Sequence, residues 1–221
     1  GTWNGVKAYA AANGLSYKYY QPANGDQATD DDRYDAMKAA CDNGAKAVVT
    51  AGFLQETALK KIAAEYPDVA FFFVDGGSVG ANVAGIVFAE EQCGYLAGYA
   101  AVVDGYTELG FLGGMAVPAV VRYGQGFVQG ADAAAKELGV TVNMKYWYSG
   151  SFAANDDIKA KMDGWYADGT QVVFACGGGI YSSAVDAASA NNGKVIGVDV
   201  DQSGDSELII TSATKVLSAS V

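Results

Sequence analysis

The sequence predicts an α/β fold with two lobes, each built on a parallel sheet flanked by helices. Strand-like and helix-like segments alternate along the whole chain, as in βαβ units. Two apolar runs end in an aspartate, at Asp75 and at Asp199, and the carboxyl end of a parallel strand faces the ligand crevice in such folds. The pattern breaks at Asp104-Gly105 and then restarts. We therefore expect a first lobe over 1–104, a second over 105–203, and a segment over 204–221 that crosses back toward the first lobe.

Turn residues delimit the predicted elements of the first lobe. A helix at 3–12 ends at Asn13-Gly14, and a helix at 30–41 begins with three acidic residues. A helix at 54–65 ends before Tyr66-Pro67, since the residue before a proline avoids helical geometry. Apolar runs predict strands at 15–20, 45–50, 69–74 and 82–88. A further helix at 90–103 carries Gly94 and Gly98, which permit close packing against a neighbouring element.

The second lobe repeats the alternation. Strands are expected at 109–112, 141–148, 171–175 and 194–198, and helices at 118–138, 156–167 and 181–191. A second crossing between the lobes is expected within 201–211.

Composition excludes several classes of function. Of the 221 residues, 51% are apolar and 18% are charged, which is typical of a globular chain. The formal charge of −11, with no basic cluster, argues against nucleic-acid binding. Histidine is absent, which removes Ser-His-Asp triads, Cys-His pairs and most zinc chemistry. No apolar run is long enough to span a bilayer. The unclustered Cys41, Cys93 and Cys176 are expected to be buried free thiols.

The two strand-end aspartates indicate a ligand rich in hydroxyl groups. A carboxylate at such a position accepts hydrogen bonds from neighbouring sugar hydroxyls. With Asp75 in the first lobe and Asp199 in the second, we expect acceptors on both sides of a cleft that binds a sugar or a nucleoside. Asp201 follows two residues later, either as a further ligand contact or as a cap; a turn or cap role is also the alternative for the other two.

Aromatic residues near predicted element ends could stack on a nucleobase. Stacking gains about 1–3 kcal/mol per ring. Trp3 lies in the first turn of the first helix, while Phe53 and Phe174 lie near strand ends. For Trp3 and Phe174, core packing is the alternative.

Two other motifs have simpler explanations. Gly177, Gly178 and Gly179 precede a helix and predict close approach of the backbone to a ligand. Together with Asp199 they imitate a dinucleotide fingerprint, but Ser182 stands in place of its last glycine. The acidic run 30–32 is typical of a helix N-terminus. We expect no metal site, no cofactor and no catalytic residue.

An ordered set of short motifs spans nearly the whole chain. They are Gly1-Thr-Trp-Asn-Gly5, Gly52-Phe53-Leu54, Glu65-Tyr-Pro-Asp68, Asn82-Val83 with Val87-Phe88, Tyr95-Leu-Ala-Gly98, Gly110-Phe-Leu-Gly-Gly-Met115, Arg122 with Gly126-Phe127, Gly150-Ser-Phe152, Gly197-Val-Asp-Val-Asp-Gln202 and Thr211-Ser-Ala-Thr-Lys215. In this set the chain resembles the basic membrane protein family of ABC-transporter substrate-binding lipoproteins, the group similar to a purine nucleoside receptor.

The resemblance implies a type I periplasmic-binding-protein-like fold and a role for particular residues. It places a stacking aromatic at Trp3, an acceptor for ribose hydroxyls at Asp199, and a lysine donating to ribose oxygens at Lys215. Arg122 is a candidate by analogy with sugar-binding proteins of the same general fold. Family members usually carry a strand just before the position of Gly1 and continue past Val221, so we expect this chain to be a trimmed piece.

These expectations combine into a non-catalytic binding protein. It would close two lobes around a nucleoside, with a purine as the expected base, and present it to the permease of an ABC importer. The resemblance implies an extracytoplasmic lipoprotein of the cell envelope, at the cell surface or in the periplasm, held to the membrane only by a lipid anchor outside this chain. The alternatives are a nucleoside hydrolase and the sensory domain of a regulator or chemoreceptor.

Overall fold

The structure, a computed structural model, describes residues 1–221 except for the side chain of Asp26. The chain divides into two units, the first formed by residues 1–88 and 216–221 and the second by residues 89–215. The boundaries expected from the sequence, at 104/105 and 203/204, differ from this division. The helix at 90–103 groups with the second unit because it packs along the long helix at 118–138.

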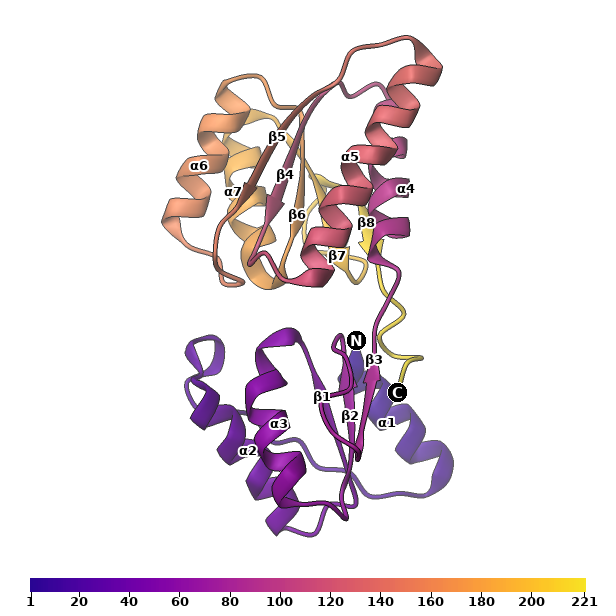
Figure 1. Ribbon diagram of the computed structural model, residues 1–221. Coiled ribbons are helices and arrows are strands. Elements are labelled where there is room, and N and C mark those ends of the chain that lie inside the picture. Colours follow the sequence, from indigo (N-terminus) through magenta and orange to yellow (C-terminus); the bar gives the residue numbers. More distant parts are fainter. The chain divides into compact units, whose positions relative to one another are not determined.

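Unit 1 is a three-stranded parallel sheet with helices (Figure 1). Its strand order is β1-β2-β3, and β2 pairs in parallel with both neighbours. The elements are α1 (Thr2–Asn13), α2 (Asp30–Asp42), β1 (Ala47–Ala51), α3 (Glu56–Glu65), β2 (Ala70–Val74) and β3 (Val83–Ile86), with 3-10 turns at Gly25–Gln27 and Phe53–Gln55.

The core of unit 1 lies between the sheet and helices α2 and α3. Phe71 and Phe73, two residues apart on β2, both lie in this core, where they pack with Leu59 and Ile62 of α3. Figure 1 shows α1 on the other side of the sheet. There the carbonyl oxygen of Ser218 approaches α1 so closely that a Cβ at Gly5 would overlap it. The return segment 216–221 therefore belongs to this unit.

Unit 2 is a five-stranded parallel sheet in the order β5-β4-β6-β7-β8. Its elements are α4 (Glu90–Val103), β4 (Glu108–Gly113), α5 (Pro118–Leu138), β5 (Asn143–Tyr148), α6 (Asp156–Ala167), β6 (Val172–Cys176), a 3-10 turn (Gly178–Ile180), α7 (Tyr181–Asn191), β7 (Lys194–Asp199) and β8 (Ile209–Thr214).

Both faces of this sheet are covered by helices. Helices α4 and α5 pack on one face, and α6 and α7 on the other (Figure 1). Strand β6 supplies side chains to both cores, as every one of its residues is buried. A strand enclosed in this way reads as a continuous apolar run, which is why 171–175 could be recognised in the sequence.

Helices α4 and α5 touch backbone to backbone through glycines spaced four apart. A Cβ at Gly94 or Gly98 of α4 would overlap a carbonyl oxygen of α5, and one at Gly126 or Gly130 of α5 would overlap a carbonyl oxygen of α4. The close packing predicted for the glycines of α4 is thus confirmed, and it fixes α4 on unit 2.

Two predicted features differ from the structure. Residues 15–20 form no strand; Tyr17 and Tyr19 instead place their rings 5.4 and 5.1 Å from the ring of Trp3. Alternation of apolar residues was present there, but a strand also needs a neighbour to pair with. Conversely, residues 209–214, assigned to the crossing, form β8 and pair with β7.

Two further expectations from the sequence concern the burial of the cysteines and the presence of membrane-spanning helices. Cys41 and Cys176 are buried, as predicted, and Cys93 is only partly buried; the structure joins none of the three in a disulfide. In the part of the chain that the structure describes, no helix is both long and apolar enough to cross a membrane.

Asp32 stabilises the start of α2 as a charged cap. Its Oδ2 accepts hydrogen bonds from Thr29 N and Thr29 Oγ1, both at 2.8 Å, while Asp32 N donates to Thr29 Oγ1. The hydrogen bond from the Thr29 backbone, followed by those from the Asn24 and Thr29 side chains, lowers the pKa of Asp32 below its usual value. This reciprocal capping gives Asp32 of the acidic run a structural role at the start of α2.

We therefore expect a stability contribution from Asp32 that depends on pH. A carboxylate whose pKa is lower in the folded state stabilises the fold above about pH 4, and the effect is lost as the pH falls through the folded-state value. Urea unfolding of Asp32→Ala should show a deficit at pH 7 that shrinks toward pH 3. Asp31→Ala, in the same helical turn, is the control and should show a smaller dependence on pH.

Candidate ligand-binding site

The carboxyl edge of the unit 2 sheet brings Asp199 and Lys215 together. Asp199 ends β7 opposite Thr214 of β8, and Lys215 N donates to the Asp199 carbonyl oxygen at 2.8 Å. The strand pairing therefore sets the two side chains side by side, with Lys215 Nζ 3.3 Å from Asp199 Oδ1. The Lys215 side chain is 3% exposed and that of Asp199 is 35% exposed, but the Asp199 oxygen that faces Lys215, Oδ1, is buried.

Asp199 has a left-handed backbone conformation, with φ of 67°. Asp and Asn tolerate this region better than other non-glycine residues, and such outliers concentrate at functional sites. Gln202 fixes the turn, because its Oε1 accepts from Val198 N at 2.9 Å and its own N donates to Ser212 Oγ at 3.1 Å. Gly197 leaves room for this arrangement, since a Cβ there would lie 2.7 Å from Ser212 Oγ.

Glu90 and Arg122 extend the pair into a chain of four charges. Arg122 Nε donates to Glu90 Oε2 at 2.6 Å, and Glu90 Oε1 lies 3.4 Å from Lys215 Nζ. Glu90 opens α4 and Arg122 lies near the start of α5. Glu90 was not identified from the sequence, because an acidic residue in the first turn of a helix is common and gives no sign of burial.

Two neutral groups surround the Lys215 ammonium. The ring of Tyr123 lies 5.2 Å from Lys215 Nζ, and its hydroxyl donates to the Ala213 carbonyl oxygen at 3.0 Å. Burial, and then the charge of Asp199, raises the pKa of Tyr123, so this phenol stays protonated. Burial also raises the pKa of Cys93, whose Sγ lies 3.3 Å from the Thr214 carbonyl oxygen. Neither group competes with Asp199 as a charged partner of the lysine.

The predicted glycine loop lies at the switch point of the sheet. In the chain β4 is followed first by β5 and then by β6, and in the sheet these two strands lie on opposite sides of β4. Ligands of open α/β sheets bind where the strand order reverses in this way. Gly177 follows β6, and a Cβ on it would lie 3.0 Å from the Cα of Gly114, just after β4. A Cβ on Gly178 would lie 2.8 Å from the Phe152 carbonyl oxygen. Both glycines thus allow a close approach to other backbone.

Two further candidates of unit 2 have structural roles. Phe174 is fully buried, and its ring packs 5.5 Å from Phe111, 5.7 Å from Tyr123 and 5.2 Å from Phe127. Asp201 is exposed and accepts from Ser203 N at 3.0 Å. The hydrogen bonds from the side chain and backbone of Ser203 lower the pKa of Asp201. The structure therefore places Phe174 in the core and Asp201 in a local turn.

Asp75 and Phe53 share one edge of the unit 1 sheet. Asp75 follows β2, with φ of 71°, and its N donates to the Ile86 carbonyl oxygen at 2.8 Å. Phe53 comes two residues after β1 and is 38% exposed. Because Ala51 of β1 is paired with Val74 of β2 in parallel, both candidates lie at the carboxyl ends of neighbouring strands. Asp75 and Asp199 thus both follow or end a strand with a positive φ, of 71° and 67°, each in its own unit.

Trp3 lies in the first turn of α1 and is partly buried. Its ring contacts Tyr17 and Tyr19, and Lys7 Nζ lies 5.9 Å from its centroid. These three contacts all lie within unit 1, and none of them involves Asp75 or Phe53.

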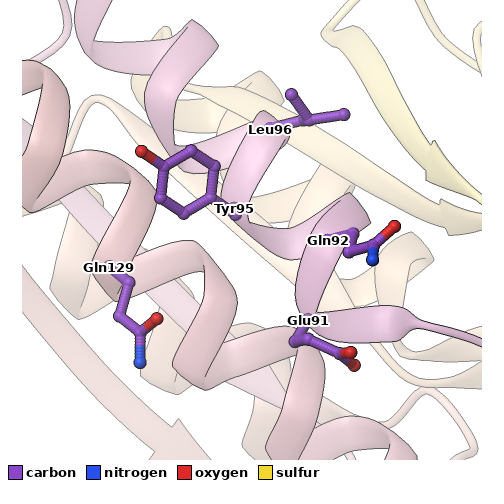
Figure 2. Close-up of a pocket in the computed structure, with 5 residues that line it drawn as sticks. All are labelled: Glu91, Gln92, Tyr95, Leu96 and Gln129. Atoms are coloured by element: carbon purple, nitrogen blue, oxygen red, sulfur yellow. The ribbon is translucent and has the colours of Figure 1, made fainter.

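The outer surface of α4 and α5 carries an open hollow, shown in Figure 2. It is lined by Glu91, Gln92, Tyr95, Leu96 and Gln129. Arg122 Nε lies 3.8 Å from Glu91 Oε2, but none of the ten residues predicted from the sequence to bind ligand lines this hollow. Its location differs from the carboxyl edges of the two sheets.

Residues 1–220 match the family model described as "ABC transporter substrate-binding protein PnrA-like", the Bmp family. The chain belongs to this family. The resemblance proposed from the motif set is therefore confirmed, and the match extends over both units. The cluster of Asp199 and Lys215 is thus part of a Bmp-family chain.

Curated relatives cover the same range at moderate identity. The chain is 29% identical over 214 residues to "ABC transporter nucleoside-binding protein BmpA" of Lactococcus lactis subsp. cremoris, covering 90% of this chain and 58% of the relative. It is 31% identical over 185 residues to "Basic membrane protein A1" of Borrelia garinii subsp. bavariensis, covering 79% of this chain and 53% of that protein. The chain thus spans little more than half the length of these relatives.

Solved structures share the fold. An ABC transporter solute-binding protein from Aeropyrum pernix K1 matches with a TM-score of 0.82 and 23% identity, over 99% of this chain and 63% of that one. A transcriptional activator of the comK gene from Bacillus halodurans matches with a TM-score of 0.78 and 20% identity, over 98% and 73%. The two-lobed periplasmic-binding-protein-like fold of type I is therefore confirmed.

Proposed function

We propose that the protein is the substrate-binding component of an ABC importer and that it binds a purine nucleoside between its two units. The permease of the importer is its macromolecular partner, and the protein acts outside the cytoplasm as a lipoprotein of the cell envelope. The names of its relatives support this role, since one is called nucleoside-binding and another basic membrane protein. It catalyses no reaction on the nucleoside.

The observation that carries the proposal is the pairing of Asp199 with Lys215. A ribose presents two neighbouring hydroxyls, each able to donate and to accept. Asp199, whose side chain is 35% exposed, offers its carboxylate to the donors, and the buried ammonium, 3.3 Å from the buried Oδ1, offers N–H groups to the oxygens. An acceptor and a donor held side by side in this way match a vicinal diol.

The other site residues divide into contacts and supports. We infer that Asp75 supplies a second carboxylate from unit 1 and that Arg122 presents donors from unit 2. Trp3 and Phe53 are the residues proposed to stack on the base. At the glycine loop, Gly177 and Gly178 let the backbone come close to the ligand. Phe174 instead packs in the core of unit 2, and Asp201 accepts a hydrogen bond within its own turn.

Binding is proposed to proceed by hinge closure. The chain passes between the units at 88/89 and at 215/216, so two short crossings allow a hinge motion. A ligand that contacts both units favours the closed state by the free energy of the contacts made only there.

Calorimetry on the full-length protein tests the proposal. Guanosine, inosine and adenosine should bind at least about tenfold more tightly than the free bases, ribose or 2′,3′-dideoxynucleosides, a difference of about 1.4 kcal/mol. The same samples, with and without calcium, should release no free base on incubation. Tighter binding of ribose alone would replace the nucleoside with a sugar, and multiple-turnover base release would show a hydrolase instead.

A further inference from the structure

We propose that Glu90 is a positioning residue of the ligand site, which holds Lys215 and Arg122 in place through its two carboxylate oxygens. This inference rests on the proposed function, because it assigns Glu90 a part in the same site. Glu90 acts through its two cations and makes no contact with the ligand.

The burial of Glu90 requires both cations. Its side chain is 0% exposed, and a buried carboxylate is stable only when it is paired and hydrogen-bonded. Arg122 Nε donates a hydrogen bond to Oε2 at 2.6 Å, and Lys215 Nζ forms an ion pair with Oε1 at 3.4 Å without a hydrogen bond to that oxygen. The carboxylate therefore bridges α5 and the end of β8 from the first residue of α4.

The four charges alternate in sign along the chain Arg122, Glu90, Lys215, Asp199. The two inner side chains, of Glu90 and Lys215, are 0% and 3% exposed, while the outer two are 36% and 35% exposed. Their formal charges cancel. Neutralising Glu90 would remove the buried carboxylate between Lys215 and Arg122, so these two cations would repel each other across its position. The exposed carboxylate of Glu91, 3.8 Å from Arg122 Nε, would still contact Arg122.

Lys215 is held from several elements before any ligand arrives. Asp199 contacts it from the end of β7, Glu90 from α4 and the ring of Tyr123 from α5. A side chain fixed in its bound position loses little conformational freedom on binding, which favours affinity. Since Glu90 and Lys215 are the second and the last residue of unit 2, this pair also joins the two segments at which that unit begins and ends.

Glu90→Gln in the full-length protein tests the inference. We expect affinity for guanosine to fall about tenfold and affinity for 2′,3′-dideoxyguanosine to change by less than about twofold. Glu91→Gln is the matched control: its carboxylate is on the next residue and 3.8 Å from Arg122 Nε, but 52% exposed, and both affinities should stay unchanged. Thermal unfolding establishes that each variant is folded. If Glu90→Gln does not fold, Glu90→Asp replaces it, with an expected loss of about threefold.

A double-mutant cycle separates positioning from general support. In a Lys215→Met background, adding Glu90→Gln should cost less than about twofold in guanosine affinity, because the positioned ammonium is already absent. Additive losses would overturn the inference, as would a single Glu90→Gln variant that binds guanosine like the unsubstituted protein. If the unsubstituted protein binds no guanosine, the proposed function fails, and the inference with it.

Discussion

Replacing Asp199 with asparagine should weaken nucleoside binding by at least about tenfold while leaving the free base nearly unaffected. Hydrogen bonds to a charged group contribute about 1.5–3 kcal/mol each, and 1.4 kcal/mol already corresponds to a factor of ten. The free base has no ribose and therefore loses nothing. Asparagine is the appropriate replacement because it tolerates the left-handed conformation of this residue, φ 67°, whereas alanine at φ > 0 adds backbone strain.

Calorimetry with guanosine and guanine measures this difference, and Asp201→Asn is the matched control. Asp201 lies two residues later, is exposed and accepts from Ser203 N, so its replacement should leave both affinities unchanged. Equal losses for guanosine and guanine in Asp199→Asn would mean that this residue only supports the fold. No loss for either would place the ligand elsewhere.

Gly130→Ala should be among the most destabilising single substitutions in unit 2. Its Cβ would overlap the carbonyl oxygen of Tyr95 in α4, and backbone cannot move aside as the end of a flexible side chain can. Overpacking of this kind costs about 1–3 kcal/mol, and occasionally more. We expect the upper part of that range, because α4 and α5 contact each other backbone to backbone.

Gly164→Ala is the control for this substitution. Gly164 is exposed in α6, and a Cβ there would meet no atom within 4 Å. Alanine in a helix interior is favoured over glycine by about 0.8–1.0 kcal/mol, so this variant should be more stable than the unsubstituted protein. Urea unfolding of the two variants should therefore show shifts of opposite sign. A stable Gly130→Ala would contradict the glycine seam between α4 and α5.

Much of the fold could be predicted because the chain marks its helix ends with particular residues. Pro118 begins α5, and Asp156 begins α6 after the cap Asn155, whose side chain accepts from Ile158 N. Strand β8 was missed because no helix separates residues 209–214 from the end of β7 and because they carry only a short apolar run. The predicted strand at 15–20 was wrong because periodicity reports which side chains are apolar and not which strand lies beside them.

The site could be predicted in part for a related reason. An aspartate that ends an apolar run is visible in the sequence, so Asp75 and Asp199 could be named as candidates. Glu90 and Gln202 were not, because their roles depend on contacts with residues far along the chain or on a turn that folds back. Phe174 was a ligand candidate by its place near a strand end, but β6 is enclosed on both faces and takes that ring into the core.

Mass spectrometry of the retained ligand tests whether the protein selects purine nucleosides. The full-length protein is equilibrated with an equimolar mixture of purine nucleosides, pyrimidine nucleosides, free bases and sugars, freed of unbound molecules by rapid filtration, and denatured to release what it holds. Purine nucleosides should be the released species, at close to one per protein molecule, and Asp199→Asn treated in parallel should retain far less. Release of a sugar or a free base in their place, or of no component of the mixture, would contradict the account.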